Sequence, residues 1–544
     1  MNQNQLAFFL SEENISKNKH YIFIIFTIMI SLISFTGLNG SLQNMDECLY
    51  ATIARDTFNS HSLIPLKNGS PYLHKSPFLF WFISFSYKIF GINDFAAKFP
   101  SAFSNLITGI CITLISYKIF NSYLSGILAA FIYNTSLQVY ASTHQVAIDS
   151  LMVMTVLVSL LFVIKGFNEN KNWFLLAALF NGLTFLTKSV MGLIIPTTLI
   201  LFLISQKRWD VILYVLFYIL ITFSISSPYF IYIHYKYPQI FSESFLSANI
   251  ISRFYPHNGF HLKNIYNIII AAIEYMVLIL AFTLPFTPGL IYTFLKRLRI
   301  NTDEPLIWGK KSKILSIYFL IVFIGFSISS ANGVWPHYTL PMLPAVFIIL
   351  SYTLLNVKKR NILLLFSIVS FITILVFIIL VSKNIRKYPT YIDVIIGLVI
   401  IYMIFAILNL FLYVKKIDTK KSIITGILIF FISFIIMTSI TVPLDFNADI
   451  KKFSKLKIDK SKPLIIINTN EVNEGHYKRR PVYWYMKMRS QEYNTFDSFL
   501  KHSKKLKHGT YILYYKGYTN KLEKMYSSFE IIEKGKIWNI AILK

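Results

Sequence analysis

Apolar segments long enough to cross a membrane alternate along the chain with short polar connections. A helix needs about 20 predominantly apolar residues to cross the hydrocarbon core of a bilayer. About thirteen segments approach this length: approximately 21–39, 97–119, 124–141, 148–166, 173–187, 189–205, 211–232, 266–295, 314–330, 336–356, 361–382, 391–414 and 421–442. The pattern predicts a polytopic α-helical membrane protein that occupies residues 1–443.

The most polar interruption is the stretch 45–81, inside a predicted outer loop at about 40–96. It brings together Asp46, Glu47, Arg55, Asp56, His61, Lys67, His74 and Lys75. Residues 46–58 have helical spacing, which predicts an interfacial helix with Glu47 and Arg55 on one face and Asp46 elsewhere. The stretch is either an ordinary loop whose acids pair with its own bases, or a site where ionisable groups at the membrane surface have a task.

Composition excludes a soluble protein and one with a single membrane anchor. The 544 residues are 55% hydrophobic and only 14% charged, and the mean hydropathy is +0.55. Such values are typical of membrane proteins with many spans.

Basic residues on alternate connections indicate the orientation. Lys and Arg favour cytoplasmic loops, and they gather at 207–208, 296–313, 358–360 and 415–421. With a cytoplasmic N-terminus and an odd number of spans, the stretch 45–81, a loop at 233–265 and the C-terminal tail all lie on the outer side. The connection that holds Lys383, Arg386 and Lys387 does not follow this rule.

The net charge of +28 does not indicate a nucleic-acid partner. The basic residues are dispersed between spans, and no nucleic-acid-binding motif is present. This charge favours membrane orientation and contact with anionic lipid headgroups. With two cysteines, Cys48 and Cys111, the chain has no disulfide framework.

Two ionisable residues stand at the outer ends of predicted spans. Asp149 opens the span 148–166 and is either a helix N-cap or a second carboxylate facing a cavity below the stretch 45–81. Lys188 lies between two short spans and either snorkels to the membrane surface or holds an anionic headgroup.

The later outer segments add histidines, an arginine and a tyrosine. The loop 233–265 carries Arg253 and His257. Together with His74, one of the histidines of this loop, His234, His257 or His261, could form a two-histidine site for zinc or another transition metal, completed by carboxylate and water. Near 329–344 three prolines interrupt a span, so that His337 and Tyr338 either contact a buried headgroup or belong to the aromatic belt.

The tail, residues 444–544, is polar and rich in lysine. Strand patterns at 462–469, 481–488, 509–517 and 537–543 alternate with helical patterns near 495–506 and 519–529. This alternation predicts a small α/β domain. We interpret it as an accessory domain outside the membrane.

Several of these motifs resemble a known family. Asp46-Glu47, Tyr50-Ala51 and Ile53-Ala54-Arg55, followed by NGSPYLHKSPFLFW, resemble the first outer loop of bacterial lipid A aminoarabinose transferases. These enzymes belong to the wider protein-mannosyltransferase-like family with the GT-C fold. FLTKSVMGLIIP, SPYFIYI and HYTLPMLPA resemble later motifs of the family in the same order.

The resemblance implies a glycosyltransferase that moves a sugar from a polyprenyl-phosphate carrier to an acceptor outside the inner membrane. Lys75, with Arg55 and Tyr338, would bind the carrier phosphate, and Lys188 and Arg253 are further candidate substrate-binding residues. Asp46 is the first candidate for the catalytic carboxylate and Asp149 the second, with Glu47 beside them. His74 and His257 would hold a structural divalent metal such as zinc.

This chain departs from the family pattern at two places. Cys48-Leu49 stands where aminoarabinose transferases have Thr-Arg, and His74-Lys75-Ser76-Pro77 stands where they have Glu-Lys-Pro-Pro. These differences affect the predicted identity of the acceptor most. Lipid A is the expected acceptor, and a surface glycan or a protein Ser/Thr are alternatives. The sugar is aminoarabinose, a hexosamine or a hexose. A flippase for lipid-linked sugars and a scaffold without chemistry remain as other classes.

Overall fold

The structure is a computed structural model of the chain. It describes residues 18–42, 45–251, 262–298, 312–330, 333–384, 392–440, 448–456, 458–467, 484–486, 490–493, 499–500, 506, 509–515, 518–526, 529–535 and 538–543.

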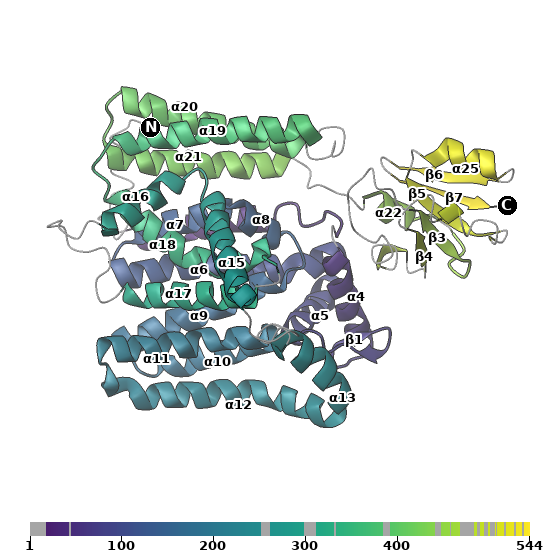
Figure 1. The fold of residues 1–544 in the computed structure, drawn as a ribbon, viewed down its shortest axis with the longest axis horizontal. Coiled ribbons are helices and arrows are strands. Elements are labelled where there is room, and N and C mark those ends of the chain that lie inside the picture. The colour runs from purple at the N-terminus through teal and green to yellow at the C-terminus, as the bar shows by residue number, and fades with distance from the viewer. Residues whose placement is uncertain are drawn as a thin grey trace.

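A bundle of apolar helices makes up most of the described chain (Figure 1). Its long members are α3 (Lys19–Phe35), α6 (Asp94–Phe120), α7 (Tyr123–Thr135), α9 (Ile148–Asn168), α10 (Trp173–Thr187), α11 (Ile194–Gln206), α12 (Ile212–Lys236), α15 (Leu262–Phe282), α16 (Thr287–Leu298), α17 (Lys313–Ser329), α18 (Leu343–Leu355), α19 (Asn361–Asn384), α20 (Ile392–Val414) and α21 (Thr419–Ile440). Eight helical segments of the described residues are long and apolar enough to cross a membrane, and further apolar helices are shorter. The prediction of a polytopic helical membrane protein is confirmed.

Each predicted span overlaps helix in its described residues, and the clearest interruptions are the following. The segment 124–141 is divided at Ser136, whose backbone is extended between α7 and α8 (Leu137–Thr143). The segment 266–295 is divided between α15 and α16, where Pro285 cannot donate a backbone hydrogen bond. The segment 336–356 begins with the short 3₁₀ helix η4 (Pro336–Thr339) before α18. Polar residues or prolines stand at each break, such as Asn134 and Ser136 at the first, and hydropathy averaged over a whole span does not resolve them.

The helices form three groups in Figure 1. One group contains α19, α20 and α21, and another contains α10, α11 and α12. Between them lie α6, α7, α9, α17 and α18, in which α6 packs against both α7 and α9. Gly126 permits the close approach of α6 and α7, since a Cβ there would lie 2.5 Å from the carbonyl oxygen of Thr113.

The stretch 45–81 contains the helix predicted at 46–58, followed by a loop with a short hairpin. The helix is α4 (Met45–Asn59), which packs against α5 (Phe78–Phe90). Between them, β1 (Leu66–Lys67) and β2 (Ser70–Pro71) form an antiparallel hairpin. Asn68 and Gly69 in its turn both have positive φ, 52° and 80°, and an Asn-Gly pair favours such a two-residue turn. In Figure 1 this unit lies at the end of the bundle that faces the C-terminal sheet.

The C-terminal residues form a five-stranded mixed sheet in the order β4-β3-β5-β7-β6. Its strands are β3 (Leu464–Ile467), β4 (Ser490–Tyr493), β5 (Tyr511–Tyr515), β6 (Phe529–Lys534) and β7 (Trp538–Leu543), with α22 (Ala448–Phe453) and α25 (Thr519–Met525) beside them. Successive residues of β3 face opposite sides, so Leu464 and Ile466 join one apolar cluster while Ile465 and Ile467 join another.

One strand of this sheet differs from the prediction. The strand expected at 481–488 is wrong at its described residues, because Trp484 and Tyr485 lie in a helical turn and the strand is β4. The other three predicted strands overlap β3, β5 and β7.

Candidate active site

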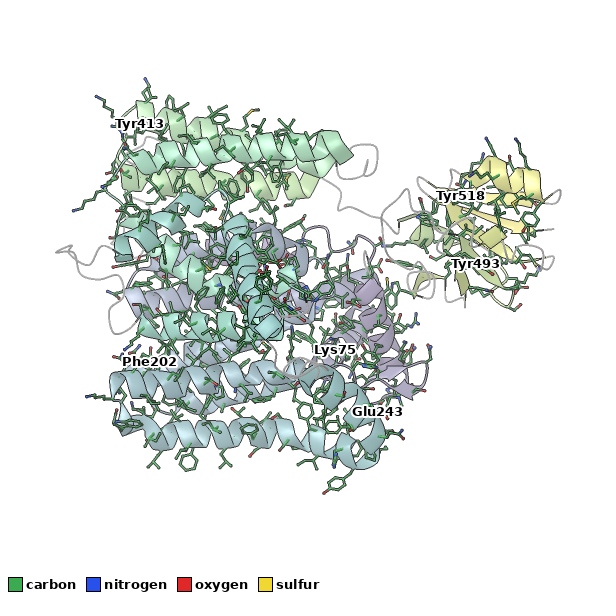
Figure 2. The ribbon with its side chains drawn as sticks, viewed as in Figure 1. Lys75, Phe202, Glu243, Tyr413, Tyr493 and Tyr518 are labelled. Carbon is green, nitrogen blue, oxygen red and sulfur yellow. The ribbon has the colours of Figure 1, made fainter. Side chains whose placement is uncertain are left out.

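A cavity of about 700 Å³ opens where α4, α8, α9, α11 and α17 meet. Its polar lining residues include Asp46, Tyr50, His74, Lys75, Ser76, Gln138, Ser142, Gln145, Asp149, Lys188, His337 and Tyr338. Figure 2 shows Lys75 near the end of the bundle that faces the C-terminal sheet, whereas Phe202 and Tyr413 lie toward the opposite end. The structure therefore brings together residues that the sequence separates by almost three hundred positions.

An ion pair between Asp149 and Lys188 lies in the cavity wall. Lys188 Nζ is 2.7 Å from Asp149 Oδ1, and the two side chains are 17% and 9% exposed. Asp149 occupies the first turn of α9, where the helix dipole favours a negative charge, but Ala147 holds the N-cap position. The N-cap interpretation of Asp149 is therefore wrong. The snorkelling interpretation of Lys188 is wrong too, because its ammonium group pairs inside the protein.

The segment with three prolines completes this wall. The ring of Tyr338 lies 4.4 Å from Lys188 Nζ, within the range of a cation–π contact. His337 Nε2 is 3.8 Å from Asp149 Oδ2. The hydroxyl of Tyr318 donates to the carbonyl oxygen of Pro341 at 2.6 Å, which fixes the segment on the bundle.

The loop after the hairpin supplies His74 and Lys75. The hydroxyl of Thr57 accepts from the amide of Leu66 at 2.9 Å, so that α4 anchors the hairpin from which the loop leaves. The pKa of His74 lies below its ordinary value of 6.5, because partial burial and then the nearby Lys75 and Lys67 disfavour the imidazolium form. His74 is therefore mainly neutral at pH 7.

An apolar wall continues from the charged part of the cavity. It is formed mainly by η1 (Ser189–Leu193), α11 and α17, which contribute Val190, Met191, Leu193, Ile194, Ile321, Val322 and Phe326. One cavity thus presents two carboxylates, two ammonium groups and an extended apolar surface. This combination suits an amphiphile with an anionic headgroup and a hydrocarbon tail.

Two predicted residues of α4 do not line the cavity. Arg55 is buried elsewhere. Its Cζ lies 5.3 Å from the ring centroid of Trp484, and its Nη1 donates to the carbonyl oxygen of Trp484 at 3.4 Å. The predicted contact of Arg55 with the carrier phosphate is therefore corrected. Glu47 is also buried, at 1% exposure, and is not part of the cavity lining, so its predicted place among the catalytic carboxylates is corrected as well.

The metal prediction is not tested by the described residues. Arg253 and His257 lie outside them. Within the described part of the chain, no cluster of three or more His, Cys, Asp or Glu residues could hold a metal ion. His74 would be a neutral ligand at the rim of the cavity, and its partner in the zinc site stays a prediction.

Sequence reasoning missed several polar lining residues. Gln138 lies in the first turn of α8 and Gln145 follows the helix, and Gln138 Nε2 donates to the hydroxyl of Ser142 at 3.3 Å. Their signal was the break in the third predicted span, since polar residues beside a helix break inside a bundle commonly line a wet cavity.

The described helices have the GT-C fold of a polytopic membrane protein. Residues 74–232 match the family described as dolichyl-phosphate-mannose-protein mannosyltransferase. The crystal structure of ArnT from Cupriavidus metallidurans bound to undecaprenyl phosphate superposes on this chain with a TM-score of 0.71 at 16% sequence identity, and the match covers 97% of this chain and 98% of that one.

Among curated sequences, the chain is similar to aminoarabinose transferases. An undecaprenyl phosphate-alpha-4-amino-4-deoxy-L-arabinose arabinosyl transferase of Serratia proteamaculans is 25% identical, over 60% of this chain and 58% of that protein. An uncharacterized protein of Aquifex aeolicus is also 25% identical, over 65% of this chain and 69% of its own length. The predicted resemblance to GT-C glycosyltransferases, and to lipid A aminoarabinose transferases among them, is confirmed.

Proposed function

We propose that the chain transfers a sugar from a polyprenyl phosphate, such as undecaprenyl phosphate, to an acceptor at the outer side of the bacterial inner membrane, with lipid A as the acceptor. The cavity carries the proposal, because it joins two carboxylates and two ammonium groups to a continuous apolar wall. The similarity to transferases whose names contain undecaprenyl phosphate supports the donor class.

Cations of the cavity bind the carrier phosphate. A leaving phosphate must be stabilised as charge develops on it. Lys75 and Lys188 both line the cavity, and Lys188 lies beside Tyr338. The apolar side chains of α11 and α17 then accept the first prenyl units, while the rest of the tail extends into the bilayer.

Asp46 acts on the acceptor. Its carboxylate is exposed at the cavity and comes from the first turn of α4. In the proposed reaction an acceptor oxygen attacks the anomeric carbon of the sugar, and its proton passes to Asp46. The bond between the anomeric carbon and the phosphate oxygen breaks, and its electron pair leaves with the polyprenyl phosphate. Asp149 orients Lys188 in this scheme.

The proposed metal has a structural role only. Zinc held by His74 and His257 would fix the outer loops over the cavity. No step of the proposed reaction runs through it.

The proposed orientation places the N-terminus in the cytoplasm and the cavity and C-terminal sheet in the periplasm. The basic connections at 207–208 and 415–421 follow α11 and α20. Phe202 and Tyr413, close to these connections, lie toward the end of the bundle opposite Lys75 (Figure 2). This distribution agrees with basic residues on the cytoplasmic side.

Mass spectrometry of lipid A tests the proposal. Lipid A is extracted from cells with the intact gene, with the gene deleted, and with the deletion complemented by the wild type, Asp46→Asn or Asp210→Asn. Asp210 is an exposed acid outside the cavity, paired with Arg208, and serves as the matched control. We expect a sugar-sized mass only with the intact gene, the wild type and Asp210→Asn. Identical spectra from all strains would overturn lipid A as the acceptor.

A further inference from the structure

A second polar cluster, away from the cavity, joins the C-terminal domain to the helices that carry the active site. Asp94, in the first turn of α6, is 6% exposed and is approached by three donors from the C-terminal domain. Trp484 Nε1 lies 3.0 Å and the hydroxyl of Tyr485 3.1 Å from Oδ1, and Lys451 Nζ lies 2.6 Å from Oδ2. We call Asp94, Lys451, Trp484 and Tyr485 the docking cluster.

The docking cluster also holds the chain on the N-terminal side of α4. The amide of Leu42 donates to the hydroxyl of Tyr485 at 2.6 Å. Lys451 Nζ donates to the carbonyl oxygen of Asn39 at 2.8 Å. The segment that leads into α4 is therefore bound by two residues of the C-terminal domain.

The body of α4 is held by the same domain. Trp484 lies against the Arg55 guanidinium, and its ring stacks on that of Tyr87 with centroids 6.3 Å apart and an interplanar angle of 23°. The hydroxyl of Tyr87 in turn donates to the carbonyl oxygen of Ala51 at 3.1 Å. Trp484 thus contacts α4 directly through Arg55 and indirectly through Tyr87 on α5.

The opposite side of α4 belongs to the cavity. Asp46 and Tyr50 line it, while Arg55 on the same helix faces Trp484. A displacement of a catalytic group by about 1 Å can reduce a rate by about 100-fold. The contacts that hold α4 on the side of Trp484 therefore help to fix the position of Asp46 in the cavity.

We infer that Asp94, Arg55 and Trp484 are positioning residues, through which docking of the C-terminal domain holds α4 and sets Asp46 at the reacting atoms. This inference rests on the proposed function for the role of Asp46. It assigns the C-terminal domain a part in turnover, although the described residues of that domain are absent from the charged part of the cavity.

Adjacent lysines of α22 offer a matched pair of variants. Lys451 reaches Asp94, whereas Lys452 pairs with Glu533 of β6 at 2.7 Å within the C-terminal domain. The full-length protein is prepared in lipid nanodiscs as the wild type, Lys451→Ala, Lys452→Ala and Trp484→Phe. Trp484→Phe removes the donor to Asp94 while keeping an aromatic ring, so it guards against loss of folding.

Two readouts separate docking from chemistry. Hydrogen–deuterium exchange of peptides covering 39–59 reports whether α4 is held, and steady-state transfer from a polyprenyl-phosphate sugar gives kcat and KM. We expect Lys451→Ala and Trp484→Phe to exchange faster in these peptides and to lose about 10- to 100-fold in kcat with little change in the donor KM. Lys452→Ala should match the wild type in both.

Faster exchange with an unchanged kcat would overturn the inference, and so would unchanged exchange in both test variants. An inactive wild type with the expected exchange pattern would contradict the proposed function and leave the docking cluster established. An equal loss in Lys452→Ala would show a general effect of charge removal and would also overturn the inference.

Discussion

Replacing Asp149 by asparagine should strengthen the binding of polyprenyl phosphate. In the structure the Asp149 carboxylate accepts a hydrogen bond from Lys188 at 2.7 Å and neutralises that ammonium group. Asparagine keeps the size and the acceptor oxygen but removes the charge. Lys188 then becomes available to a phosphate that enters the cavity.

The magnitude follows from the geometry of the pair. Unit charges about 4 Å apart interact by about 4 kcal/mol at an effective dielectric constant of about 20. Both side chains are largely buried, but they border an open cavity, so solvent and the other cavity charges reduce this value. We take about one third of this interaction energy, about 1.4 kcal/mol, which corresponds to about a tenfold gain in the affinity for the phosphate.

Titration of undecaprenyl phosphate into the protein in nanodiscs measures this effect. Lys188→Met should weaken binding, and the double variant should resemble Lys188→Met, because the gain from Asp149→Asn depends on the lysine. Glu169→Gln is the control, since Glu169 also pairs with a lysine, Lys118, but outside the cavity. Unchanged or weaker binding by Asp149→Asn would refute the assignment of Lys188 to the phosphate.

Three further results are expected. Because the pKa of His74 is lowered in the folded protein, the imidazole is protonated more readily in the unfolded chain as the pH falls below 6.5, and its protonation favours unfolding. In chemical unfolding, His74→Gln should therefore lose less stability than the wild type between pH 7 and pH 5. Equal losses of stability would contradict this prediction. Gly126→Ala should lower the free energy of unfolding by about 1–3 kcal/mol through overpacking against Thr113, and an unchanged unfolding midpoint would show that α6 and α7 can separate. Ile321→Asp should raise the KM for a long-chain donor more than for one with a shortened prenyl tail, because it places a charge in the apolar wall; equal changes would exclude this wall as the tail site.

The sequence was sufficient to predict the helical class, the helix at 46–58 and the charged residues that line the cavity. Hydropathy placed Asp46, Lys75, Asp149 and Lys188 on one side of the membrane by span parity. Span parity placed other ionisable residues on that side as well, in the loop 233–265 and the tail, so it did not by itself gather these four in one cavity. Their partners could not be assigned, because Asp149 and Lys188 come from helices whose rotation depends on packing.

Arg55 shows what local reasoning could not supply. Helical spacing correctly placed it away from Asp46, but its partner on that side is Trp484, 429 positions later. Trp484 itself lies in a segment with a strand-like pattern, and its turn became evident only with the C-terminal domain in place. Tertiary contacts of this separation leave no trace in periodicity.

The charges of the cavity have a consequence for the reaction cycle. Two carboxylates and two ammonium groups balance among its described residues when His74 and His337 are neutral, so an incoming anion meets little net attraction and depends on displacing Asp149 from Lys188. A sugar-linked phosphodiester brings one negative charge, whereas the released phosphate monoester carries about two at pH 7. In the proposed reaction the spent carrier therefore carries more negative charge than the fresh donor, and we expect the ammonium groups of the cavity to hold it more firmly.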